Sequence, residues 1–159
     1  MKSSLPSPLE AAILAYCVWQ ASDLPVSWLT APAVKYAWIA FIIWCLPAFW
    51  HIGYCILNEK PKGSQPWLLG AAIVASLLGM LGSLNMLKHI GLALAIAGLI
   101  PFSLGVPIWV GTALAWLPGF GWMIKGLPFV VIPIIQIVIA SIGTVVMFLT
   151  SRRTENEQE

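Results

Sequence analysis

The sequence predicts an all-α integral membrane protein, a bundle of four to six transmembrane helices with one short or re-entrant segment. The composition carries this prediction: hydrophobic residues make up 60% of the chain, charged residues only 9%, and there are nine tryptophans. A soluble domain has about 25% charged residues, so too few charges remain here to solvate a globular surface. Tryptophan prefers the membrane–water interface, so its abundance fits several membrane crossings.

The length of 159 residues limits the chain to one transmembrane domain. Each spanning helix needs about 20 apolar residues, so residues 1–150 hold the spans and residues 151–159 form a charged tail. No stretch is long and polar enough for a soluble domain. The net charge of +2 is too small to indicate binding to nucleic acid, so we expect none.

Two segments are predicted to span the membrane. Residues 36–57 carry no formal charge if His51 is neutral, and residues 127–150 form a long apolar run. Pro47 is expected to kink the first of these helices, because proline removes a backbone donor and clashes with the preceding turn.

Residues 67–87 and 90–105 are predicted to pack on each other as a helical hairpin. Both carry small residues about one helical turn apart, a spacing that lets a neighbouring helix approach closely. These residues are Ala71, Ala75, Gly79 and Ser83 in the first segment and Gly91, Ala95 and Gly98 in the second. We therefore expect them to line the contact between two helices.

Two further segments are predicted either to cross the membrane or only to dip into it. Residues 9–24 are short, follow Lys2 and end at a polar break, an outline that a signal peptide shares. Residues 106–122 are too short and too broken for an ordinary span, which predicts a short tilted or re-entrant helix. The number of true spans depends on these two segments.

The basic residues favour an orientation with both termini in the cytoplasm. If all six segments cross, one side of the membrane holds five basic residues, Lys2, Lys60, Lys62, Arg152 and Arg153. The other side holds three, Lys35, Lys88 and Lys125. Four spans give the same count of five against three. Because basic residues gather on the cytoplasmic side, we predict a multi-pass protein of a prokaryotic inner membrane.

The stretch TALAWLPGFGWMIKGLPF, residues 112–129, is predicted to be an interfacial turn or a re-entrant corner. Tryptophan suits the interface, proline and glycine end and turn helices, and lysine can reach the headgroups. The residues with these properties are Trp116, Pro118, Gly119, Gly121, Trp122 and Lys125. A surface that binds a ligand or a partner is the alternative interpretation.

No residues along the chain form a recognisable catalytic or metal-binding set. The cysteines at positions 17, 45 and 55 do not have the paired spacing of a zinc site. Cys55 follows His51 by four residues, so one helix face can present both, but no acidic, arginine or amide partner lies nearby in the sequence. Charged residues fall at segment ends, which argues against an ion-coupled transporter.

His51 is the stronger of two candidates for a cofactor ligand. It lies in an apolar run beside Trp50 and Tyr54, and neutral imidazole commonly ligates haem or a chlorophyll-type pigment. His89 is weaker, because it is expected in a turn beside Lys88. The alternative for His51 is a hydrogen bond to a carbonyl or a lipid headgroup near a helix end.

Two amide side chains, Gln136 and Asn85, lie in or near predicted spans. An amide inside an apolar helix is expected to hydrogen-bond a neighbouring helix, because the bilayer core offers no water. For Asn85 a lipid headgroup or a partner loop is the alternative.

Three stretches in the second half of the chain follow one another in a recognisable order: LNMLKHIGLALAIAG (84–98), LAWLPGFGWMIKGLPF (114–129) and VVIPIIQIVIASIGTVV (130–146). Residues 67–148 with this order resemble the amino-terminal membrane half of the exosortase/archaeosortase family. Members of that family are multi-span proteins that process sorting-tagged substrates. The resemblance implies a proline–glycine turn ahead of a long helix.

The chain departs from that family where the chemistry is expected. The family's proposed catalytic Cys, Arg and His lie downstream of the similar region, whereas the cysteines at positions 17, 45 and 55 all precede it. The resemblance therefore implies a truncated, non-catalytic relative. Three hypotheses follow: a small subunit that packs among other integral membrane subunits and lipids, with quinone or pigment as further contacts; a truncated exosortase-like processing protein or its partner; and a small transporter.

Overall fold

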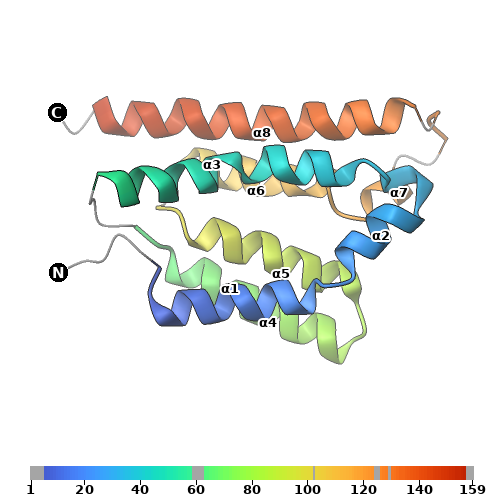
Figure 1. Ribbon diagram of the computed structural model, residues 1–159, viewed down its shortest axis with the longest axis horizontal. Helices are drawn as coiled ribbons and strands as arrows, with labels where there is room; N and C mark the ends of the chain where they lie inside the picture. The colour runs from blue at the N-terminus through green and yellow to red at the C-terminus, as the bar shows by residue number, and fades with distance from the viewer. Residues whose placement is uncertain (1–5, 59–62, 102, 124–125, 129, 157–159) are drawn as a thin grey trace. The chain divides into compact units, whose positions relative to one another are not determined.

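The computed structural model describes residues 6–58, 63–101, 103–123, 126–128 and 130–156, and all regular structure in these residues is helical (Figure 1). The predicted all-α class is confirmed. The elements are α1 Pro8–Gln20, α2 Leu24–Thr30, η1 Pro32–Val34, α3 Ala37–Leu57, α4 Pro66–Leu81, α5 Asn85–Gly98, α6 Gly105–Gly111, η2 Thr112–Ala115, α7 Phe120–Met123 and α8 Val131–Asn156.

Two of the described helices are long and apolar enough to cross a membrane. These are α3 and the Val131–Thr150 part of α8, with mean hydropathies of 1.8 and 2.4. They coincide with the two segments that the sequence predicted to span. The other predicted segments form helices of 16 residues or fewer, because glycine, serine and proline end them early. The described residues thus contain two helices of spanning length where the sequence predicted four to six.

The chain divides into two compact units, and the boundary falls inside α3. Unit 1 comprises Met1–Ser22 and Pro47–Phe102, and unit 2 comprises Asp23–Leu46 and Ser103–Glu159. Each unit has its own buried core. Pro47, which is expected to weaken the helix, is the first residue of unit 1 within α3.

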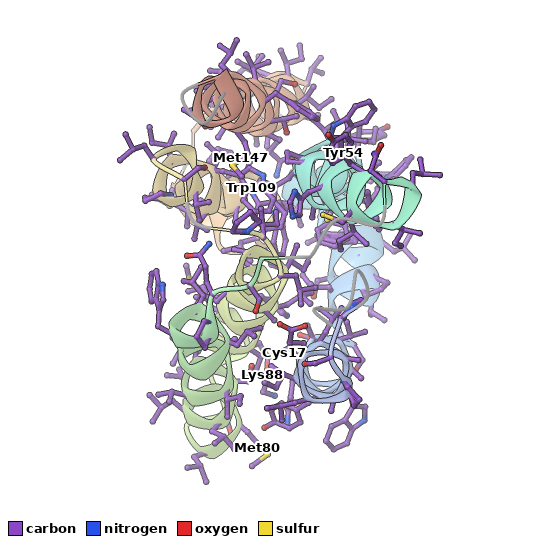
Figure 2. All side chains as sticks on the ribbon, turned by 90° about the vertical axis from the view of Figure 1, so that its left-hand side faces the viewer. Cys17, Tyr54, Met80, Lys88, Trp109 and Met147 are labelled. Carbon is purple, nitrogen blue, oxygen red and sulfur yellow. The ribbon has the colours of Figure 1, made fainter. Side chains whose placement is uncertain are left out.

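In unit 1, helices α1, α4 and α5 pack against one another (Figure 1). Helix α1 starts at a capping box, in which the Ser7 hydroxyl accepts from the Glu10 amide and the Glu10 carboxylate accepts from the Ser7 amide. Helix α5 has seven buried residues, more than α4 or α1. The side chain of Cys17 points from α1 into the space between the helices (Figure 2).

Helix α4 ends earlier than the sequence predicted, at Leu81 instead of residue 87. Ser83 takes a positive φ of 53°, and the Leu84 amide donates to the Gly79 carbonyl at 2.8 Å. This six-to-one bond satisfies a carbonyl at the helix end and turns the chain back. Lys88 therefore lies inside α5, and so does His89, which the sequence placed in a turn.

In unit 2, helix α8 packs on α6, η2 and η1. The buried face of α8 carries Ile132, Gln136, Ala140, Thr144 and Met147. Figure 2 shows Met147 directed toward α6, and Trp109 of α6 directed into the unit. These three helical segments are short, so the contacts of α8 come from several pieces of chain.

Candidate functional site

Two buried tryptophans in unit 2 form a reciprocal pair. The indole N–H of Trp44 donates to the Trp109 carbonyl at 2.7 Å, and the indole N–H of Trp109 donates to the Trp44 carbonyl at 2.8 Å. Their rings stack with centroids 4.4 Å apart and planes inclined by 13°. The pair joins α3 to α6 through two hydrogen bonds and one ring contact. Both indole donors are used by the fold, so this pair is a structural clamp.

The proline in α3 explains why this region needs side-chain donors. Pro47 has no N–H, so the Ile43 carbonyl four residues earlier loses its partner within the helix. The Thr144 hydroxyl of α8 donates to that carbonyl at 2.9 Å. An unpaired backbone carbonyl in an apolar interior is costly, and a neighbouring hydroxyl is a known remedy. The kink that the sequence predicted at Pro47 stays a prediction, and the sequence did not identify Thr144 as the compensating donor.

Further aromatic rings pack against the Trp44–Trp109 pair and against one another. Trp116 lies 4.9 Å from Phe41 at 76° and 5.5 Å from Trp44 between ring centroids. The Trp28 indole donates to the Trp116 carbonyl at 3.0 Å, and its ring lies 5.5 Å from Phe41. Edge-to-face and tilted contacts of this kind stabilise beyond the area they bury. We call Trp28, Phe41, Trp44, Trp109 and Trp116 the aromatic cluster.

The predicted interfacial turn falls partly inside this core. Trp116 is 0% exposed, so its ring packs within unit 2. Pro118 and Gly119 form the half-buried turn that leads into α7, and positions 121 and 122 belong to α7 itself. Lys125 lies outside the described residues. A proline–glycine turn ahead of the long α8, as the family resemblance implied, is therefore present between η2 and α7.

The small residues of α5 fit closely against α4. A Cβ atom at Gly91 would overlap the Ser76 hydroxyl, and one at Gly98 would come within 2.8 Å of the Leu69 side chain. Ala95 has no exposed surface. These three residues therefore lie where the sequence analysis expected them, on the face of α5 turned toward the hairpin partner.

On α4 the buried face is rotated by one residue from the predicted stripe. Gly79 is buried against Lys88, whereas Ala71 and Ala75 are half-exposed and Ser83 lies in the turn. The residues that face inward are Leu68, Leu69, Ala72, Ser76 and Gly79. A row with a period of four drifts around a helix of 3.6 residues per turn, so such a row cannot face one partner throughout.

Three polar contacts hold unit 1 together beside these small residues. The Sγ of Cys17 lies 3.5 Å from the Ser76 Oγ, which joins α1 to α4. Gln65, just ahead of α4, donates its backbone N–H to the Gly98 carbonyl and its side-chain Nε2 to the Ile100 carbonyl, both at 2.8 Å. Gln65 thus ties the start of α4 to the end of α5.

His51 lies half-buried on α3, with its Nε2 3.5 Å from the Sγ of Cys55. The thiol is 3% exposed, and no group of three or more metal-ligating side chains occurs in the described part of the chain. A haem or chlorophyll-type metal bound through this nitrogen would displace the thiol contact. His89 is 2% exposed inside unit 1. Ligation by His51 stays a prediction.

Comparisons with protein-family models, with curated proteins and with solved structures return no match. The resemblance to the exosortase/archaeosortase family therefore rests on the sequence features alone and stays a prediction.

Proposed function

We propose that this chain is a small, non-catalytic integral membrane subunit that packs within a larger membrane protein complex and stabilises it. One observation carries the proposal: only 33% of the apolar window in each of α3 and α8 is buried. A core helix of equal hydropathy in a soluble protein would be mostly buried. Apolar surface on this scale needs lipid or protein around it.

The exposed apolar side chains of these helices follow helical periodicity. Those on α8 recur every three or four residues along one face: Ile134, Val138, Ile142, Val145 and Leu149. Those on α3 do the same: Trp38, Ile42, Leu46 and Phe49. A continuous apolar stripe opposite a packed face is typical of a helix that contacts the bilayer or a partner helix. Bound lipid is expected along these stripes.

The short helices support the assignment to a complex. Helices α1, α5 and α4 have 13, 14 and 16 residues, whereas a spanning helix needs about 20. The ends of such helices leave backbone groups inside the hydrocarbon unless protein covers them or the bilayer thins. Neighbouring subunits would supply that cover. The proposed location is a prokaryotic inner membrane, multi-pass, with both termini in the cytoplasm.

Gly70 adds a second argument for close contact with a partner helix. It is exposed in the interior of α4, and a Cβ placed there meets nothing within 4 Å. Glycine inside a helix costs about 1 kcal/mol relative to alanine. Packing within the chain does not offset this cost at Gly70, whereas it does at Gly91. Close approach by a helix of another subunit would offset it.

Two measurements on the native membrane test the proposal. Extraction at alkaline pH should leave the chain in the membrane pellet, and release into the supernatant would contradict an integral membrane protein. Solubilisation in mild detergent, followed by a native gel and mass spectrometry, should show the chain migrating with other membrane subunits. A single monomeric band without co-migrating proteins would contradict membership of a complex.

A separate measurement addresses the predicted pigment on His51. An absorption spectrum of the purified complex should lose a haem or chlorophyll-type band in His51→Ala if His51 is the ligand. His89→Ala serves as the control, because that side chain lies buried on another helix. Equal spectra of the original protein and His51→Ala would contradict ligation by His51.

A further inference from the structure

Gln136 is a buried amide without an evident role in the fold. It has no exposed surface, and in the described part of the chain neither its Oε1 nor its Nε2 has a hydrogen-bond partner. Buried polar groups are almost always hydrogen-bonded, because leaving them unpaired costs the free energy of their lost hydration. Gln136 therefore calls for a partner that carries both a donor and an acceptor.

Trp116 presents the same anomaly in the same unit. Its ring is 0% exposed, and its Nε1 has no hydrogen-bond partner among the described residues. The other buried tryptophans of the aromatic cluster differ, because Trp28, Trp44 and Trp109 each donate to a carbonyl. Trp116 is thus an indole donor that the cluster does not use.

The packing register brings these two residues to within about one helical turn of each other along α8. Gly105 at the start of α6 packs against Met147 and Thr150, and Gly143 packs against Thr112 at the start of η2. The segment α6–η2 therefore runs along α8 in the opposite direction. Continued by one turn from Thr112, this register sets Trp116 opposite about Ile139, within one helical turn of Gln136.

We propose that unit 2 binds a small, neutral, hydroxyl-bearing ligand between Gln136 and Trp116, with a water molecule as its smallest form. The hydroxyl oxygen accepts from the Trp116 Nε1–H or the Gln136 Nε2–H, and a hydroxyl hydrogen donates to the Gln136 Oε1. The ligand is neutral because both protein groups are neutral and neither can balance a buried charge. This inference does not rest on the proposed membrane function.

Thermal unfolding of the full chain, followed by far-UV circular dichroism, gives the first test. Met has nearly the volume of Gln but no amide, so Gln136→Met removes the proposed hydrogen bonds alone. If the original protein holds the ligand, the Tm of Gln136→Met should lie about 2–4 °C below that of the original protein. This difference corresponds to the loss of roughly one net hydrogen bond in a chain of this size. An unchanged or raised Tm would overturn the proposal, since removing an unpaired amide is neutral or stabilising.

Gln65→Met is the matched control. Gln65 is also a buried glutamine, and its Nε2 donates to the Ile100 carbonyl, so its loss calibrates the effect of one amide hydrogen bond. Trp116→Phe keeps the ring contacts but removes the indole donor. If both residues hold one ligand, the Tm losses of Gln136→Met and Trp116→Phe should be clearly non-additive in the double variant. Additive losses would contradict a shared ligand.

Nuclear magnetic resonance then identifies the ligand. The Trp116 indole N–H, assigned through its loss in Trp116→Phe, should show a cross-relaxation peak to a hydroxyl hydrogen. A peak at the water frequency identifies water, and one at another frequency identifies an apolar alcohol or a lipid hydroxyl retained through purification. The peak should disappear in Gln136→Met but persist in Gln65→Met. Absence of any such peak in the original protein would overturn the proposal.

Discussion

The two units differ in the side chains that fill the contacts between their helices. In unit 1, glycines such as Gly91 and Gly98 bring α5 so close to α4 that an added Cβ would overlap a neighbour. In unit 2, tryptophans fill the space between helices and donate to backbone carbonyls. Unit 2 also has tight glycine contacts, at Gly105 and Gly143, so both units should be sensitive to added volume. Unit 2 should in addition be sensitive to lost volume and lost donors at its tryptophans.

The largest effect is expected for Trp109→Ala. It removes the stacked ring and the hydrogen bond from the Trp109 indole to the Trp44 carbonyl. The bond from the Trp44 indole ends on the backbone carbonyl of residue 109, which alanine retains. Large-to-small substitutions of buried tryptophan cost about 3–5 kcal/mol of unfolding free energy. Trp109→Phe, which keeps a ring but loses the donor, should cost markedly less. Equal melting of Trp109→Ala and the original protein would show that the pair is not a clamp.

The next effect concerns the carbonyl that Pro47 leaves without a helical partner. Thr144→Val keeps the shape but removes the donor to Ile43, which should cost about 1–3 kcal/mol of unfolding free energy. In a Pro47→Ala background the helix regains its own donor, so Thr144→Val should then cost much less. A double-mutant cycle of unfolding free energies measures this coupling. A coupling near zero would contradict the compensating role of Thr144.

A matched pair of glycine substitutions tests the close contact in unit 1. Gly91→Ala places a Cβ against the Ser76 hydroxyl and the Ala72 carbonyl and should destabilise by about 1–3 kcal/mol. Gly70→Ala meets open space and should stabilise the isolated chain by about 0.5–1 kcal/mol. Thermal melting of the two variants should therefore shift in opposite directions. Shifts of the same sign would refute the distinction between these glycines.

The smallest effect is expected for Ser76→Ala. It removes the contact between Cys17 Sγ and Ser76 Oγ at 3.5 Å, and a thiol is a weak hydrogen-bonding group. The loss of unfolding free energy should stay below about 1 kcal/mol. Because the Ser76 hydroxyl is one neighbour that a Cβ at Gly91 would meet, Ser76→Ala should also reduce the cost of Gly91→Ala. Strictly additive melting shifts would speak against this contact.

The sequence correctly predicted features that depend only on neighbouring residues along the chain. The apolar runs at 36–57 and 127–150 correspond to α3 and α8, the two helices of spanning length. The boundary after α4 was wrong, because the left-handed conformation of Ser83 ends the helix although no proline is present. The inward residues of α4 differ from the expected row by one position, since sequence spacing does not specify which side meets a partner.

The composition and the apolar runs by themselves determined that this chain is built of apolar helices, and they located the two that are long enough to cross a membrane. The structure decided that the other helices of the described residues are shorter than a span. Only the tertiary structure decided that Thr144 completes the hydrogen bonding of Ile43, 101 residues away, and that Trp44 and Trp109 bond each other. It also left Gln136 and Trp116 buried with donors that no other described residue uses. The reason is physical: helical periodicity follows from neighbours along the chain, whereas partners for buried polar groups come from whichever helices pack beside them.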